Sequence, residues 1–174
     1  MGLFGPSNPV FAMLKQDHAK VKKLFEDFER AKDARAKARI VRDTLLELDV
    51  HAKLEETLIY PAIRQKLDAE EIMDEALEEH HVAHTLINEL RRGAKSNGRY
   101  EAKFKVLGES IKHHVKEEEG TMFPEAENAD LDWEALAQKA MARKQVLMAR
   151  KDASGERRGR RNAKARRKPL RKAA

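Results

Sequence analysis

An eleven-residue stretch that occurs twice constrains this chain more than any other feature. It reads HAKLEETLIYP over residues 51–61 and HVKEEEGTMFP over residues 114–124. The histidine, the lysine, two adjacent glutamates and the final proline are identical, and an aromatic residue precedes the proline in both copies. A weaker echo lies ahead of each copy, with DHAKVKKLF over residues 17–25 and EHHVAHTLI over residues 79–87. The chain is therefore predicted to use one two-helix unit twice.

Along four segments, residues at successive steps of three and four fall on one face of an α-helix, and most of them are apolar. The apolar members of the four stripes are Leu14, Val21, Phe25 and Phe28; Val41, Leu45, Leu48, Leu58 and Ala62; Met73, Ala76 and Ile87; and Phe104, Leu107, Ile111 and Met122. With 38% charged and only 5% aromatic residues, the composition also favours long amphipathic helices. Four such helices with short connections predict an all-α, up-down-up-down four-helix bundle.

The bundle is expected over residues 9–128, after an N-terminal arm over residues 1–8. Asn8 precedes Pro9, which is typical of a helix start. Beyond the bundle we expect a short C-terminal helix over residues 129–151, capped by Asp132, and a disordered basic tail over residues 152–174.

Pro61 lies inside the helical pattern of the first repeat copy. Proline lacks the N–H that would bond the carbonyl four residues back, here that of Thr57. A kink or a loosened turn is therefore expected in this helix.

Charge is unevenly distributed along the chain. From Arg150 to the C-terminus there are twelve Lys and Arg and two acidic residues, whereas the rest carries 24 basic and 28 acidic residues. This density suits phosphate contacts with little sequence discrimination, so non-specific nucleic acid is one expected partner of residues 152–174. A solubilising extension is an equally supported interpretation. An anionic membrane surface is a third, although no apolar anchor assists it.

The chain contains no cysteine. This excludes disulfides, thiolate metal sites, iron–sulfur clusters and cysteine nucleophiles, and leaves imidazole and carboxylate as the strong side-chain ligands. The sequence also shows no signal-peptide pattern and no run of about 18 apolar residues that could span a bilayer. We therefore expect a cytoplasmic protein without a membrane span.

The core-facing stripes also carry imidazoles and carboxylates, which an apolar core does not normally hold. These residues are His18; His51 and Glu55; His80 and His84; and His114 and Glu118. Residues four apart lie one turn above each other, so each pair points two ligands at the same place. Two uncompensated carboxylates would each cost on the order of several kcal/mol, so a cation is expected between them. Seven such donors suit two ions bridged by the carboxylates, with iron, manganese or zinc favoured.

This set resembles the ligand set of the hemerythrin-like, or HHE cation-binding, domain over roughly residues 9–125. The resemblance implies two non-haem irons, with zinc or manganese less favoured. One iron would be held by His80, His84 and His114, the other by His18 and His51, and both by the bridging residues Glu55 and Glu118. The resemblance further implies an open position on the iron with two histidines, where dioxygen, peroxide, nitric oxide or azide would bind for sensing, protection or detoxification. It leaves open whether the site turns its ligand over, in a catalase-like or oxidase reaction.

The last ligand departs from the pattern of the oxygen-carrying hemerythrins, which bridge with an aspartate five residues after the last histidine. Here Glu118 lies four residues after His114, although His113 to Glu118 and His114 to Glu119 also make five-residue steps. The repeat aligns His114 and Glu118 with the first copy, so we choose that pair. This departure favours the broad bacterial HHE group, linked to oxygen or iron sensing and to handling peroxide or nitric oxide, over reversible oxygen carriage.

Two histidines and two glutamates adjoin the predicted ligands. His81 and His113 are each rotated by about 100° from a ligand position, so we expect no direct metal contact from them. Glu56 and Glu119 are expected on the helix surface or beside the ligands. Two other functional hypotheses remain: a regulatory module in which the metal state alters how the basic tail contacts nucleic acid, and a structural zinc or manganese bundle.

Overall fold

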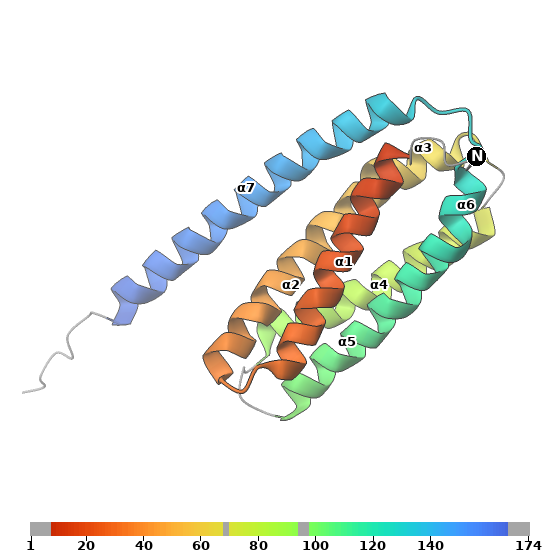
Figure 1. Cartoon of the computed structure of the whole chain (residues 1–174). Coiled ribbons are helices and arrows are strands. Elements are labelled where there is room, and N and C mark those ends of the chain that lie inside the picture. Colours follow the sequence, from red (N-terminus) through yellow and green to blue (C-terminus); the bar gives the residue numbers. More distant parts are fainter. Residues whose placement is uncertain (1–7, 68–69, 94–97, 167–174) are drawn as a thin grey trace, which may run out of the picture.

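The computed structural model describes residues 8–67, 70–93 and 98–166, and every regular element in these ranges is a helix. Four long helices, α1 (Pro9–Arg30), α2 (Ala34–Leu54), α4 (Glu70–Arg92) and α5 (Gly98–Glu117), run up-down-up-down in a bundle (Figure 1). The predicted fold class is thus confirmed. The elements that complete the chain are η1 (Glu55–Ile59), α3 (Tyr60–Arg64), η2 (Glu118–Met122), α6 (Phe123–Ala126) and α7 (Trp133–Arg166).

Short polar side chains begin three of the helices. The Oδ1 of Asn8 accepts hydrogen bonds from the backbone of Val10 at 3.0 Å and of Phe11 at 3.3 Å, so the predicted start of the first helix is confirmed. Asp33 caps α2 and Asp132 caps α7 by accepting from the N–H group three residues on. Each cap satisfies a backbone donor that the helix itself leaves free.

Each copy of the repeat contains one turn of π-helix. The Tyr60 N–H bonds the Glu55 carbonyl, and the Phe123 N–H bonds the Glu118 carbonyl, five residues back in both cases. A proline follows each turn, and its missing N–H favours such a widened turn. The loosened turn predicted near Pro61 is therefore present.

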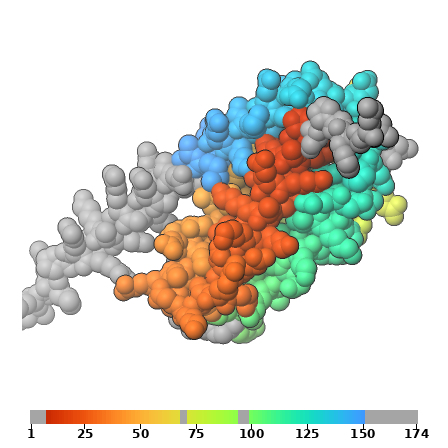
Figure 2. All heavy atoms as spheres, viewed as in Figure 1, coloured from red at the N-terminus to blue at the C-terminus, as the bar shows by residue number. Residues whose placement is uncertain are grey.

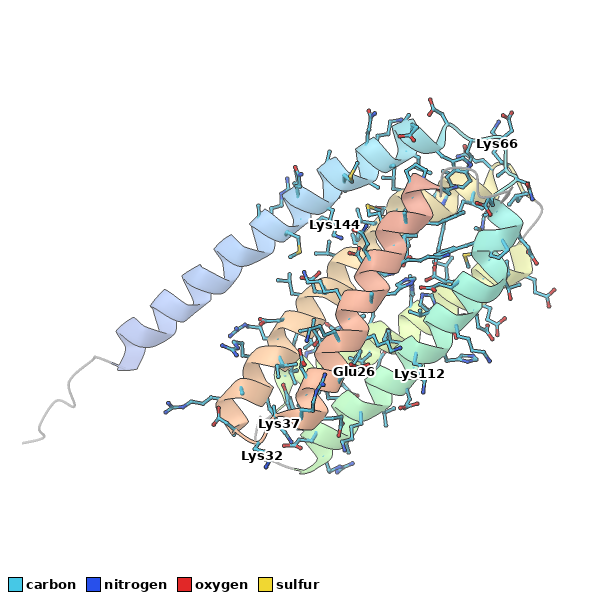
Figure 3. All side chains as sticks on the ribbon, in the orientation of Figure 1. Glu26, Lys32, Lys37, Lys66, Lys112 and Lys144 are labelled. Atoms are coloured by element: carbon cyan, nitrogen blue, oxygen red, sulfur yellow. The ribbon has the colours of Figure 1, made fainter. Side chains whose placement is uncertain are left out.

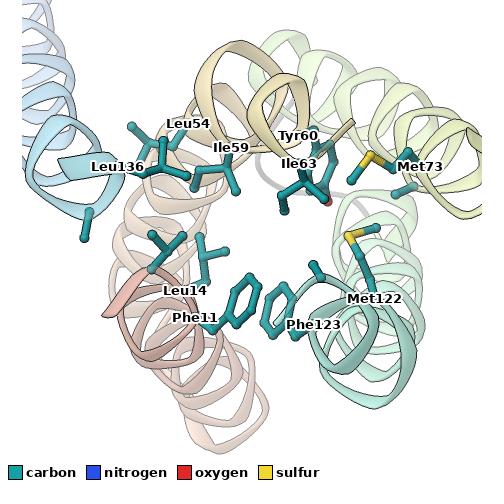
Figure 4. Close-up of a cluster of buried hydrophobic side chains, with 14 of the residues drawn as sticks. Phe11, Leu14, Leu54, Ile59, Tyr60, Ile63, Met73, Met122, Phe123 and Leu136 are labelled. Carbon is teal, nitrogen blue, oxygen red and sulfur yellow. The ribbon is translucent and has the colours of Figure 1, made fainter. Parts of the chain in front are cut away.

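The bundle has two apolar clusters, one toward each end. The cluster near α3 and α6 includes the stacked rings of Phe11 and Phe123, whose centroids lie 4.5 Å apart, and it receives Leu136 from α7 (Figure 4). The other cluster, near the α1–α2 turn, is built around Phe28 and Phe104. On α1 the buried His18 lies between Leu14 of one cluster and Val21 of the other, and on α2 the buried His51 lies between Leu54 and Leu48. The buried histidines therefore occupy the level between the two clusters.

The fifth long helix, α7, packs against α1 and α2 on the outside of the bundle (Figure 1). The sequence predicted a short helix ending at residue 151, but α7 continues to Arg166. Arginine and alanine are the commonest of the extra residues, and their helix propensity favours continuing a helix that has no apolar stripe. Residues 167–174 of the predicted tail, and residues 1–7 of the predicted arm, lie outside the described residues. None of the helices described combines the length and apolar content needed to cross a membrane.

Candidate metal centre

The structure brings six of the seven predicted ligands together in the middle of the bundle. They are His18, His51, Glu55, His80, His114 and Glu118. All six side chains are buried, and the two glutamates are 0% and 1% exposed. Such carboxylates are not helix-surface residues, and their burial needs a compensating positive charge.

The first half of the cluster is formed by helices α1 and α2. The Nε2 atoms of His18 and His51 lie 3.1 Å apart. Oε1 of Glu55 lies 3.0 Å from the Nε2 of His51, and Oε2 of Glu118 lies 3.2 Å from the Nε2 of His18. Two nitrogens and two carboxylate oxygens thus converge on one point.

The second half repeats this arrangement on α4 and α5. The Nε2 atoms of His80 and His114 lie 3.1 Å apart. Oε2 of Glu55 lies 3.4 Å from His80, and Oε2 of Glu118 lies 3.4 Å from His114. The two glutamates therefore contact both halves, Glu55 with one oxygen on each side.

The seventh predicted ligand, His84, stands apart from both groups. Its Nε2 lies 2.7 Å from Oε1 of Glu56, and its side chain is 37% exposed. Its ring centroid is 6.4 Å from that of His80. As placed, His84 points at a carboxylate beside the cluster, and its role as a ligand stays a prediction.

The inward histidines turn their other ring nitrogen toward a carboxylate. Nδ1 of His18 lies 2.7 Å from Glu119, and Nδ1 of His114 lies 2.8 Å from Glu79. A carboxylate accepts, so Nδ1 is the donor in each of these contacts. The lone pair of each imidazole is then on Nε2, where it faces the cluster as a metal ligand would.

In the remaining two histidines Nδ1 also faces a carboxylate, at a longer distance and without a hydrogen bond. Nδ1 of His51 lies 3.5 Å from Asp17, and Nδ1 of His80 lies 3.4 Å from Glu56. All four inward histidines are therefore backed by an acidic side chain.

These outer carboxylates follow the internal repeat. Asp17 directly precedes His18, as Glu79 directly precedes His80. The glutamates after the two buried ones, Glu56 and Glu119, fill the other two places. Sequence reasoning missed Asp17 and Glu79, although an acidic residue before the first histidine in both echoes was an available signal.

Two further histidines lie away from the cluster, as predicted. His81 is exposed, and the side chain of His113 is 59% exposed near Glu79 and Glu117. By contrast, His114 is buried. The structure therefore supports the alignment of His114, rather than His113, with the first repeat copy.

Protons can balance only part of the charge in the cluster. Burial opposes ionisation of Glu118, but contact with His18 and the charge of His114 lower its pKa below the usual range. Burial likewise opposes protonation of His51, but the charge of Glu55 outweighs it and raises the pKa of His51 to about 10. In the absence of metal, a proton on His51 thus takes the place of a cation.

The other half of the cluster has mixed tendencies. Burial and the charge of Glu118 raise the pKa of Glu55. Burial and the charge of His114 lower the pKa of His80 to about 3, so its imidazole stays neutral. Burial also opposes protonation of His114, but contact with Glu79 and the charge of Glu118 outweigh it and raise the pKa of His114. A metal ion needs neutral imidazoles and ionised carboxylates, so its binding would displace the protons that the raised pKa values favour.

Unpaired atoms provide a direct test of whether a metal fits. Both oxygens of Glu55 and Oε2 of Glu118 are buried without a hydrogen-bond partner. Buried polar atoms in native proteins are nearly always satisfied, and an unsatisfied carboxylate among imidazole lone pairs is explained by a bound cation. The six residues therefore fit a pair of ions ligated by nitrogen and oxygen.

One side chain breaks the two-fold similarity of the cluster. The Tyr60 hydroxyl donates a 2.7 Å hydrogen bond to Oε1 of Glu118, whereas its counterpart Phe123 has no hydroxyl. Each ring stacks on a histidine, Tyr60 on His80 and Phe123 on His18. Burial and the neighbouring glutamates raise the pKa of Tyr60, so it keeps its proton and holds Glu118 in place.

A cavity of about 20 Å³ adjoins the four inward histidines. Its other walls are mainly apolar and include Val21, Leu48 and Ile111. Neither Glu55 nor Glu118 lines it, so it contacts the imidazoles and not the carboxylates. A cavity of this size accommodates one molecule about as large as water.

Three comparisons place the chain among known proteins. The family described as Hemerythrin HHE cation binding domain matches residues 10–126. A solved structure of a Hemerythrin HHE cation binding domain-containing protein from Mycobacterium kansasii is 26% identical, covers 84% of this chain and 89% of that one, and superposes with a TM-score of 0.69. A protein named DNA nickase, from Nostoc sp., is 25% identical over 119 residues, which are 67% of this chain but only 33% of that protein.

The family match spans the bundle and includes all of the converging histidines and glutamates. The match to the solved structure extends this agreement to the three-dimensional fold. The chain therefore belongs to the hemerythrin HHE cation-binding domain family, as a metal-binding helical bundle.

Proposed function

We propose that this protein is a non-haem di-iron protein that binds dioxygen or a related small species, such as peroxide or nitric oxide, for sensing, protection or detoxification. One observation carries the proposal. Two groups of buried histidines share two glutamates with unpaired oxygens, and a small, mainly apolar cavity adjoins them. This arrangement suits a redox-active pair of ions that is open to a small molecule.

The cluster assigns the ligands in two sets. His18 and His51 would hold one iron, and His80 and His114 the other. Glu55 and Glu118 would bridge the two, since each contacts both halves. When bound, such an iron pair supplies an open coordination position and a reversible change of oxidation state.

His84 would complete the second set after a rotation of its side chain. It already lines the same cavity as the four inward histidines. Such a rotation would separate it from Glu56, its present partner at 2.7 Å. The first set would then have two histidines and the second set three. The open coordination position would therefore be on the ion held by His18 and His51.

The protein's own residues prepare this position in three ways. Glu119 and Asp17 orient the rings of His18 and His51. The apolar cavity wall keeps competing water away from the site. On the opposite side of the cluster, the hydroxyl of Tyr60 retains its proton and fixes Oε1 of Glu118.

Metal analysis and visible spectroscopy of the purified protein test the proposal. We expect about two irons per chain and an absorbance that changes when the reduced protein meets air, peroxide, nitric oxide or azide. His51→Ala should lose the signal, whereas His113→Ala, which changes an exposed ring, should keep it. An iron-containing protein whose absorbance changes with none of the four small molecules would contradict the proposal. Zinc or manganese at full occupancy would indicate a structural bundle.

A second candidate function concerns the C-terminal helix. The residues from Arg150 onward are strongly basic, and the chain is similar over part of its length to a protein named DNA nickase. We propose that this segment contacts nucleic acid through phosphates, and that the metal state of the bundle alters the contact. Removing residues 152–174 should abolish binding to a DNA duplex at low salt and leave the metal content unchanged. Equal binding by the truncated protein would reject this function.

A further inference from the structure

A groove of about 1030 Å³ runs between α1 and α5. It follows the boundary between the red-orange and green helices that face the viewer in Figure 2. At one end its walls include His18 and Glu119, beside the candidate metal centre. Its volume is at the upper end of the range for small-molecule sites.

The internal repeat shows where the lining of this groove differs from the first half of the molecule. At the offset that aligns His114 with His51, Gly108 of α5 corresponds to Leu45 of α2, which is buried. Gly108 lines the groove, and a Cβ placed there would lie 3.0 Å from the ring of Phe25. The glycine thus removes a side chain that the first half of the molecule retains, and Phe25 lies over the space.

The equivalent boundary between α2 and α4 is bridged instead. Arg91 forms an ion pair with Asp49, and it also donates to the backbone carbonyl of Leu45. Under the repeat, Asp49 corresponds to Lys112 and Arg91 to Glu29, so the charges are reversed. Glu29 pairs with Lys105, 3.2 Å away, near the far end of the α1–α5 groove.

Charge is polarised along the groove. Its metal-centre end is lined by four lysines and one glutamate, Glu119, and is therefore positive on balance; the lysines are Lys15, Lys22, Lys112 and Lys116. The far end has Glu26, Glu29, Lys105 and Glu109 on its rim. Glu26 and Lys112 come from the two helices that form the groove (Figure 3).

The lysines at the metal-centre end are available to a ligand. In the part of the chain that the structure describes, Lys22, Lys112 and Lys116 form no ion pair with an acidic side chain. Lys15 lies 6.0 Å from the ring of Phe123. This end of the groove would therefore attract an anionic group without first breaking an ion pair.

The floor of the groove is apolar. The half-buried side chains of Phe25, Ile111 and Val115 supply its surface, and the fully buried rings of Phe28 and Phe104 lie beneath them. An occupant with an anionic head and a long apolar tail matches both the charge and the surface. Nucleic acid does not match it, because the far rim is mainly acidic.

We propose that the α1–α5 groove binds a long-chain fatty acid, with the carboxylate at the lysines near His18 and the aliphatic chain over Phe25, Ile111 and Val115. This site goes beyond the proposed di-iron function and does not depend on which metal the bundle holds. The groove and the small cavity share His18, Val21, Ile111 and Val115 as walls. A bound fatty acid therefore covers the approach to the cavity from this side.

Binding is measured with a fluorescent polyene fatty acid added to the full chain, and metal content is determined on the same sample. Gly108→Leu restores the side chain found at the equivalent position of the first half and should weaken binding about tenfold. Because this change forces Phe25 to move, a second variant is required. Lys112→Glu combined with Lys116→Glu alters only the rim and should also weaken binding about tenfold.

Two controls make the test decisive. Lys139→Glu changes an exposed lysine of α7 away from the groove and should bind as the unaltered protein does. The neutral alcohol of the same chain length should bind the rim variant and the unaltered protein equally. The proposal would be overturned if the unaltered protein binds no fatty acid, or if both groove variants bind it as tightly as the unaltered protein does. It would also be overturned if the unaltered protein binds the acid no more tightly than the alcohol. Fatty-acid binding by protein that contains no iron would support this site while the di-iron proposal fails.

Discussion

Lys144 of α7 forms an ion pair with the buried carboxylate of Asp17, whose other oxygen lies 3.5 Å from Nδ1 of His51. Lys144 lies on the side of α7 that faces the bundle (Figure 3). The fifth helix therefore contacts the metal centre through one intermediate side chain. In the described residues, the corresponding carboxylate of the second half, Glu79, contacts histidines and no lysine or arginine.

Lys144→Ala should destabilise the protein by about 1 to 2 kcal/mol, because Asp17 keeps its charge in a buried position and loses its partner. The value lies below that for a fully buried pair, since the lysine side chain is 26% exposed. Urea unfolding measures the change, and Lys139→Ala on the same helix is the matched control. A Lys144→Ala variant as stable as this control would show that α7 does not depend on the ion pair.

The carboxylates behind the histidines should control metal affinity in both halves. Asp17→Asn and Glu79→Gln keep the side-chain shape but remove the carboxylate charge beside His51 and His114, respectively. We expect each change to reduce metal affinity about 10- to 100-fold. Competition with a chelator measures the affinity. Glu78→Gln, an exposed neighbour of Glu79, is the control. Unchanged metal affinity in both variants would mean that the imidazoles of His51 and His114 do not need a carboxylate behind them to bind metal.

His84 offers a test that separates seven ligands from six. If its side chain rotates onto the second metal, His84→Ala should lower the iron content or the affinity of one of the two sites. His81→Ala, three residues earlier and exposed, should leave both unchanged. If metal content and spectrum are the same in the two variants, the ligand set is the six residues that converge in the structure.

The sequence predicted the fold because one physical signal was repeated. The seven polar residues fall in phase with the apolar stripes of four helices, and only a bundle with these faces turned inward brings them together. The same phase argument predicted the position of Glu55 and Glu118 on the axis. These features depend on helical periodicity alone, so they can be derived from a single sequence.

Other features depend on details that periodicity does not contain. The direction of a histidine ring decides which carboxylate lies behind it. The repeated acidic residue before a histidine marks Asp17 and Glu79 in the sequence, but that they lie behind His51 and His114 is seen only in three dimensions. His84 has the correct phase, yet its side chain points at Glu56. The structure continues α7 to Arg166, beyond the end expected at residue 151, and this continuation depends on helix propensity without an apolar pattern.

The stability of the metal-free protein should pass through a maximum at about pH 6.5. On the alkaline side, the folded pKa of His51 is about 10 against an ordinary 6.5, so the folded chain holds a proton that the unfolded chain releases. This contribution is complete below the ordinary pKa and is lost as the pH rises through the folded pKa. Stability should therefore decline over this range.

Acid should destabilise the metal-free protein by the opposite mechanism. The pKa of His80 is lowered to about 3. As the pH falls below 6.5, His80 therefore binds a proton in the unfolded chain but stays neutral in the folded chain. The lowered pKa of Glu118 adds a further loss below its ordinary value of 4.5. Urea unfolding midpoints of metal-free protein between about pH 4 and pH 10 measure the profile. His51→Ala should reduce the decline on the alkaline side, and the raised pKa of His114 should preserve part of it. Stability that instead rises from neutral to alkaline pH in the unaltered protein would contradict this account of the charge balance.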